Sequence, residues 1–421
     1  MRGAGRQNPY VLDGLGFAHP ASIFANRSFR LYFAGQAASF VGDGLRTIAL
    51  PLLVFHLTGS ALTLGVTYAL QFLPFALAGL VGGSLADRLD RRRLMIACDF
   101  IRLFAVVVLV IGLERGFLSL GIIYASIVVI SISAAVFLGG EASSIPFVLG
   151  KDKATQAVSV LIAAEQAAGL VAPPLGGALF SLGGAVPALV VNALAYLVSF
   201  GAISRIKTLG PESPGRLPTT RELWSDIRTG FAFLWADAAM RAITLMSLGL
   251  NLFGMMAFAI YIPFYKNVLG ANDAQVGLTL GIGAIGTMLG SLLAGASAGR
   301  WPFGRSLSIA YALDAILFVP IVFLHNLWLV TLFWTVANVG AGFETAQIVS
   351  WRMRIIPQAS VGRVFGAVRL IVLIGIVPGS IAGGYLAQLY GPRLPLLVAT
   401  AGYLILALGA MAVRAVRDDT R

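Results

Sequence analysis

Apolar segments of twenty or more residues recur along this chain, and no other feature constrains its fold as strongly. A bilayer's hydrocarbon core is about 30 Å thick and takes about 20 apolar residues per spanning helix. Segments of that length recur between residues 31 and 413. A β-barrel does not fit, because barrel strands alternate polar and apolar residues over about ten positions. With 58% hydrophobic residues and a mean hydropathy of +0.87, the chain is predicted to be an all-α polytopic membrane protein.

The apolar segments divide into two sets of six. The predicted organisation is an N-terminal segment (1–30), a six-helix bundle (31–204), a linker with an amphipathic helix (205–240), a second six-helix bundle (241–413) and a tail (414–421). The predicted spans are 31–56, 62–86, 94–113, 118–140, 157–182, 185–204, 241–265, 275–297, 306–325, 327–350, 363–389 and 392–413. Two pseudo-symmetric bundles of six helices are therefore expected.

The placement of basic residues predicts the orientation of these spans. The net charge of +12 would suggest a nucleic-acid ligand in a soluble protein. Here most Lys and Arg residues fall on the side shared by both termini and the linker, and Arg115, Lys266 and Arg393 fall opposite. The positive-inside rule then places both termini in the cytoplasm of a bacterial-type cell. The charge indicates topology, and we expect no nucleic-acid partner.

The chain lacks the residue patterns of an enzyme or a metal protein. Its one cysteine is Cys98, and its three histidines are scattered, so no ligand spacing appears. We find no Walker loop, GxSxG or HExxH motif. We therefore expect no enzymatic activity, metal or cofactor, and an ion gradient, carried by protons, as the energy source.

Two pairs of sequence stretches suggest that the halves are related copies. "GSLADRLDRRR" (83–93) and "GASAGRWPFGR" (295–305) each join the second and third spans of a half. "GGEASSIP" and "GFETAQIV" place Glu141 and Glu344 where each fourth span meets the cytoplasm. Matches at two equivalent places favour an internal repeat.

The loop after the second span resembles that of the major facilitator superfamily, whose pattern is roughly GxLaDrxGrk. "ADRLDRRR", the run "GQAASFVGDGLRTIALPLLVFHLTGSALTLG" and the stretch "DIRTGFAFLW" resemble the branch with macrolide efflux proteins and the enterobactin exporter. In that family the loop locks the two halves in one state. The resemblance thus implies a conformational latch made of Gly83, Asp87, Arg88, Arg91, Arg92 and Glu141, with Glu141 as the expected partner of Arg91. The alternative is that the arginines only set topology.

The fifth predicted span contains "AAGLVAPPLGG" (167–177), which is similar to the family's antiporter pattern GPxxGG. Pro173, Gly176 and Gly177 match, while Ala172 replaces a glycine. Such residues permit a bend and close backbone approach. The resemblance implies an exporter, and a helix bend with packing value alone is the alternative.

Charged residues inside the spans are candidates for function, because a charge in hydrocarbon is costly. Asp43 lies near the middle of the first span and Arg46 one turn on; Glu165 lies in the fifth span. We expect these three to bind protons or substrate. The alternatives are a structural Asp43–Arg46 pair and a Glu165 that reaches the headgroups. Asp99 and Arg102, three residues apart, are expected to form a structural pair.

Polar and aromatic residues on several spans are predicted to line a central cavity of the mostly apolar kind that binds drug-sized ligands. These are Gln36, Tyr68, Gln71, Asn251, Phe253, Tyr261, Trp334 and Asn338.

The sequence thus predicts a monomeric secondary active exporter in the lipid bilayer of the cell membrane. Its partner would be a hydrophobic or amphipathic small-molecule substrate, moved out by proton antiport and alternating access. Export of a siderophore or lysophospholipid is the alternative within transport. A membrane sensor or scaffold that does not transport is the alternative from another class.

Overall fold

The computed structural model describes residues 21–86, 89–207, 209–210, 219–297, 301–357 and 360–413, and the regular elements within them are helices. The helices are α1 (Ala21–Phe24), α2 (Arg27–Thr58), α3 (Ala61–Ala86), α4 (Arg91–Glu114), α5 (Leu120–Leu149), α6 (Lys151–Gly183), α7 (Ala185–Ser204), α8 (Thr220–Ala236), α9 (Ala238–Ala259), α10 (Tyr261–Asn267), α11 (Asp273–Ala296), α12 (Phe303–Phe323), α13 (Leu327–Ile355), α14 (Val361–Tyr390) and α15 (Arg393–Ala412).

Within the described residues, twelve helical segments are long and apolar enough to cross a membrane, which confirms the predicted all-α architecture. The structure differs from prediction inside the seventh span, where the helix is interrupted at Ile260. Pro263 has no N–H to donate to the carbonyl of Ala259, so α9 ends there and α10 begins with proline in its first turn. The tenth span also runs further than predicted, to Ile355.

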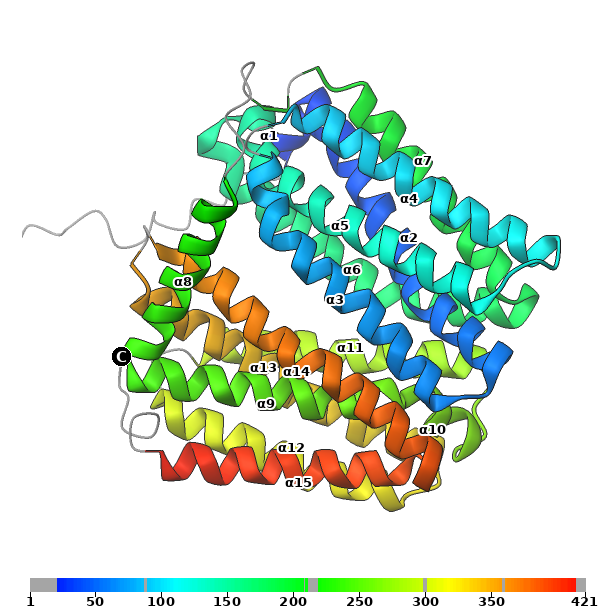
Figure 1. The fold of residues 1–421 in the computed structure, drawn as a ribbon, viewed down its shortest axis with the longest axis vertical. Helices are drawn as coiled ribbons and strands as arrows, with labels where there is room; N and C mark the ends of the chain where they lie inside the picture. The colour runs from blue at the N-terminus through cyan, green and yellow to red at the C-terminus, as the bar shows by residue number, and fades with distance from the viewer. Residues whose placement is uncertain are drawn as a thin grey trace, which may run out of the picture.

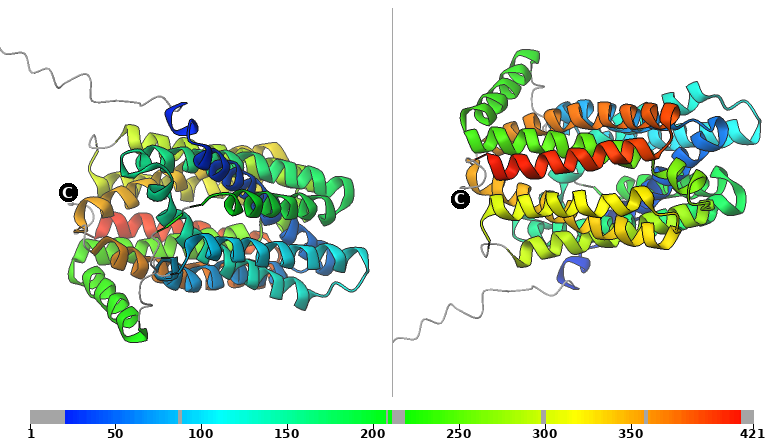
Figure 2. Two further views of the ribbon diagram at one scale, coloured as in Figure 1. Left: turned by 90° about the horizontal axis from the view of Figure 1, so that it is seen from above. Right: turned by 90° about the horizontal axis from the view of Figure 1, so that it is seen from below.

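The helices form two bundles that meet at an angle (Figure 1). The first bundle contains α2–α7 and the second contains α9–α15. The bundles converge at the end of the molecule where α10 lies, which we call the α10 end, and diverge at the end where α8 lies, the α8 end. Figure 2 shows α8 projecting from the margin of the assembly in both views.

Small residues bring the two bundles into backbone contact at the α10 end. On α3, a Cβ atom at Gly65 would lie 2.3 Å from the carbonyl oxygen of Ser380 on α14. On α6, a Cβ atom at Gly177 would lie 2.9 Å from the Cα of Gly277 on α11. Only glycine permits this approach, which joins helix pairs by van der Waals contact in lipid.

The linker helix α8 begins with a capping box. Thr219 accepts from the N–H of Glu222, and Glu222 accepts from the N–H of Thr219, so two N–H groups at the helix start are satisfied. Trp224, Ile227 and Phe231 of α8 face an apolar groove of about 1040 Å³ between α3 and α14. An apolar face beside two membrane helices suits a helix at the bilayer surface.

Candidate functional site

A network of paired charges occupies the centre of the first bundle. Arg46 lies 3.3 Å from Asp43 one turn away on α2, and the hydroxyl of Tyr196 on α7 donates to the same carboxylate. Arg102 of α4 approaches the other oxygen of Asp43 to 3.7 Å. Three helices thus direct polar groups at one carboxylate, which lowers the cost of holding its charge in an apolar bundle.

The same network continues to a fully buried carboxylate, Asp99. Arg102 bonds Asp99 on its own helix, which confirms the pairing expected from their spacing, and Ser199 donates to Asp99 at 2.7 Å. The guanidinium of Arg102 also lies over the rings of Phe137 and Tyr196, at 4.3 and 4.6 Å from their centroids. Two carboxylates therefore meet two guanidinium groups.

A cavity of about 280 Å³ adjoins this network and brings three acids together. It is lined by Asp43, Glu141 and Glu165, with Gln36 and Arg102 beside them. The structure thus places Asp43 and Glu165 on one cavity wall, although they lie on α2 and α6. Glu141, which was expected at the latch, belongs to the same wall. Because Asp43 is paired with Arg46 and Arg102, Glu141 and Glu165 are the acids of this cavity that can attract a proton or a cationic group.

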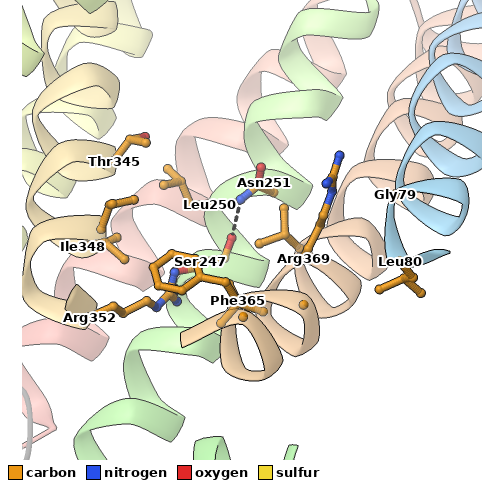
Figure 3. Close-up of a pocket in the computed structure, with 15 residues that line it drawn as sticks. Gly79, Leu80, Ser247, Leu250, Asn251, Thr345, Ile348, Arg352, Phe365 and Arg369 are labelled. Atoms are coloured by element: carbon orange, nitrogen blue, oxygen red, sulfur yellow. Dashed lines mark hydrogen bonds between the residues drawn. The ribbon is translucent and has the colours of Figure 1, made fainter. Parts of the chain in front are cut away.

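A second cavity, of about 630 Å³, lies between the bundles toward the α8 end and has a basic wall (Figure 3). Arg352 donates to the hydroxyl of Ser247 at 3.0 Å, and Asn251 donates to the carbonyl of Ser247 at 2.7 Å. Arg369 extends from α14 toward Gly79 of α3, where a Cβ atom would meet its guanidinium at 2.9 Å. This wall can bind an anionic group.

Arg352 is a cavity residue that the predicted spans do not include. The predicted tenth span ended at residue 350, because the charges of Arg352 and Arg354 broke the apolar run. The helix continues to Ile355 and holds Arg352 buried at 4% exposure. The sequence spacing could have indicated this burial. Glu344, Ile348 and Arg352 are four residues apart and therefore share one helix face.

Five of the eight predicted cavity-lining residues lie either at the two cavities or in a chain of aromatic rings. Gln36 and Asn251 line the two cavities. Tyr68, Tyr261 and Trp334 are buried instead in an aromatic chain that passes through Phe258. These rings connect α3 of the first bundle to α9, α10 and α13 of the second.

Of the three other predicted cavity residues, Phe253 and Asn338 take part in helix packing. Phe253 packs against Gly402 of α15, where a Cβ atom would lie 2.3 Å from its ring. Asn338 donates to the carbonyl of Trp334 and accepts from Thr287 of α11 at 3.4 Å. The side-chain nitrogen of Gln71 is buried with no hydrogen-bond partner in the described part of the chain.

The predicted latch lies at the α8 end, where the bundles diverge. Arg91 donates to the carbonyl of Ser143 at 2.9 Å and lies over the ring of Phe147, both on α5. Arg92 donates to the carbonyl of Ser204 on α7. These contacts stay within the first bundle. Asp87 and Arg88 lie outside the described residues, and nothing is described of the surroundings of Gly83.

The proline–glycine motif of α6 lies at the contact between bundles. The carbonyl of Pro173 would meet a Cβ atom at Gly277 at 2.3 Å, and Gly177 faces the same residue. Gly176 faces α2, where its Cβ atom would lie 2.3 Å from Ile48. The motif therefore lets α6 pack closely against α11 of the second bundle on one side and against α2 on the other.

Replacing Gly177 with leucine is expected to separate α6 from α11 and to expose the α10 end. The readout is labelling of a single cysteine at Ser60, with Cys98 changed to serine, by a membrane-impermeant maleimide. Gly295→Leu on the partner helix α11 is the matched control, because a Cβ atom there meets nothing within 4 Å. Severalfold faster labelling is expected for Gly177→Leu alone, and equal rates in both variants would contradict the contact.

The described residues contain no group of three or more His, Cys, Asp or Glu side chains that could hold a metal ion.

The sequence of this chain matches a family of membrane transporters and several named efflux proteins. Residues 32–325 and 244–421 match the family model described as Major Facilitator Superfamily. The multidrug efflux pump Tap of Mycolicibacterium fortuitum is 27% identical over 62% of this chain and 65% of its own length, so the match spans just under two thirds of that relative. Macrolide efflux protein A of Streptococcus pyogenes is 24% identical over 63% of this chain and 66% of its own.

A solved structure has the same fold in two states. The bacterial homologue of the iron transporter ferroportin matches in its inward-facing state with a TM-score of 0.73, at 15% identity over 91% of this chain and 98% of that one. The outward-facing state matches with a TM-score of 0.58, at the same identity and coverage. The family-model match and the twelve apolar helices show that this chain is a multi-pass membrane protein that belongs to the major facilitator superfamily of transporters.

Proposed function

We propose that this chain is a proton-coupled exporter of a hydrophobic or amphipathic small molecule, working by alternating access. One observation carries the proposal. A charged cavity lies between the bundles toward the α8 end, while backbone contacts close the α10 end. A transporter that rocks two bundles about a central site needs a cavity closed on one side at a time.

The end at which the cavity is open supports an assignment of the cytoplasmic side of the protein. The higher TM-score with an inward-facing transporter than with its outward-facing form agrees with a cavity open toward the cytoplasm. The α8 end would then be cytoplasmic and both termini would lie there, as the basic residues predict. The membrane would be the plasma membrane of a bacterial-type cell.

The substrate class follows from two adjoining surfaces. The apolar groove beside α8 and the cavity between the bundles share Leu80. A molecule with an apolar body could enter from the bilayer and place a polar group among the charges of the cavity. Relatives named as multidrug and macrolide efflux proteins support this class. Asp43, Arg46 and Glu165 are the proposed proton or substrate residues, and one chain is the proposed working unit.

A lysophospholipid is the second candidate substrate. The groove of about 1040 Å³ is lined almost entirely by apolar side chains, and Arg352 and Arg369 lie in the adjoining cavity. A single acyl chain in the groove would place an anionic phosphate near these two guanidinium groups.

Transport in proteoliposomes tests the function. An imposed pH gradient is expected to drive release of a macrolide, and a lysophospholipid assay gives the second arm. Glu165→Gln is expected to slow gradient-driven transport severalfold, because it removes an ionisable group from the cavity wall while keeping its size. Glu114→Gln, an exposed acid at the end of α4, is the control. No transport of either substrate, or equal transport in both variants, would contradict the proposal.

A further inference from the structure

The second bundle contains a buried pair of acids that differs from the network in the first bundle. Asp314 of α12 is 1% exposed, and Glu344 of α13 is 0% exposed. Their carboxyl groups lie close enough to interact directly. A Cβ atom at Gly340, one turn before Glu344, would lie 2.1 Å from an oxygen of Asp314, so this carboxyl group touches the backbone of α13.

The oxygens of this pair lack donors. Both carboxyl oxygens of Glu344 and one of Asp314 are buried with no hydrogen-bond partner among the described residues. The hydroxyl of Tyr311, three residues before Asp314 on α12, is also buried without a partner among these residues. A buried carboxylate without donors is costly, so these atoms indicate a ligand that supplies a hydrogen bond or a positive charge.

The groups around the pair offer no direct ion pair in the described structure. Two buried tyrosines, Tyr311 of α12 and Tyr403 of α15, lie near enough to interact electrostatically with the pair, and a protonated phenol carries no charge. Arg352 lies two turns along α13, where its guanidinium donates to Ser247. The neighbouring helix α11 has one ionisable residue, Asp273, at its first position. In the first bundle, by contrast, Asp43 and Asp99 each contact an arginine.

We propose that Asp314 and Glu344 together bind one exchangeable proton, forming a second proton site separate from the acids of the first bundle. Two adjacent carboxyl groups without a cation are not both ionised, and one shared proton satisfies an oxygen on each. A metal ion is the poorer fit, because hard cations take about six oxygen ligands and the backbone at Gly340 leaves no gap beside Asp314.

The position of the pair connects it with transport. Glu344, Ile348 and Arg352 lie along one face of α13, and the last two line the cavity between the bundles. The site is therefore one helical turn from the cavity wall. This step rests on the proposed function: the proton at the pair would be taken up or released when the cavity changes sides.

Infrared difference spectroscopy of the purified full-length protein in lipid nanodiscs tests the site without any substrate. Raising the pH is expected to remove the carbonyl bands of protonated carboxyl groups, and Glu344→Gln and Asp314→Asn are each expected to abolish the part of this change that comes from the pair. Glu114→Gln is the matched control and is expected to keep it. Since Gln and Asn are neutral and similar in size, both variants are expected to fold, which size-exclusion chromatography checks.

The outcomes separate this site from the proposed function. An unchanged band in both Glu344→Gln and Asp314→Asn would overturn the proton site, as would a band that responds to Na⁺ at constant pH and not to pH. Misfolding of both neutral variants would also overturn it, since the proposal requires that a neutral pair be tolerated. A pH-dependent band in a protein that moves no substrate would support the site and contradict only the transport function.

Discussion

Replacing Arg102 with methionine is expected to destabilise the first bundle by about 3–5 kcal/mol, the cost of breaking a buried ion pair by removing one partner. Methionine retains much of the apolar length of the side chain, so the cavity left behind is small. The buried carboxylate of Asp99 would keep Ser199 as donor but lose its guanidinium partner. Asp43 would keep Arg46 and Tyr196. Most of the lost stability therefore comes from the unpaired charge of Asp99.

Thermal and denaturant unfolding in one detergent measure this effect. Arg93→Met is the matched control, because Arg93 is 88% exposed in its pair with Asp90 and exposed pairs contribute about 0–1 kcal/mol. The double variant Arg102→Met/Asp99→Asn is expected to recover part of the loss, since it removes the uncompensated charge together with its partner. A single variant as stable as the Arg93 control would contradict this account, as would a double variant less stable than the single.

The contrast between the two bundles is a difference in how buried acids are compensated. In the first bundle, Asp43 and Asp99 are balanced by Arg46 and Arg102 and need no proton to be neutral as a group. In the second, Asp314 and Glu344 contact one another, and neither has an ion pair within the described residues. We therefore expect Asp314 and Glu344 to depend on proton uptake more than Asp43 and Asp99 do.

The spans could be predicted because hydrocarbon thickness fixes helix length regardless of tertiary detail. The Asp43–Arg46 and Asp99–Arg102 pairs could be expected because residues three apart share a helix face. The link from Arg102 to Asp43 depends on how α4 packs against α2 and α7, which no local spacing specifies. The same limit applies to Asp314 and Glu344, which lie on different helices.

Two residues with the same predicted role also have different surroundings in the fold. Tyr68 and Asn251 were both predicted to line the cavity, because each is polar and lies on a suitable span. Only the packing shows that Tyr68 lies in the aromatic chain against Phe258, while Asn251 faces the cavity. The interruption at Ile260 was missed because Pro263 lies in an otherwise continuous apolar run, and hydropathy does not register a missing N–H.

Joining the bundles covalently at the α10 end is expected to abolish transport completely. His56 of α2 and Asp273 of α11 approach to 3.1 Å, and Lys266 contacts both. Alternating access requires this contact to break whenever the cavity opens on that side. A short reducible bis-thiosulfonate linker between cysteines at positions 56 and 273, with Cys98 changed to serine, would hold the end closed.

The single variants His56→Cys and Asp273→Cys, treated with the same reagent, are the controls. Each single variant loses the contact between positions 56 and 273 but cannot be linked within one chain, so its transport is expected to continue. Reduction of the linker is expected to restore transport in the double variant, because the block is mechanical and leaves the cavity residues unchanged. Full transport by the linked protein would mean that the α10 end stays closed throughout the cycle. The backbone contacts at Gly65 and Gly177 would then be permanent, and the two bundles could not rock about them.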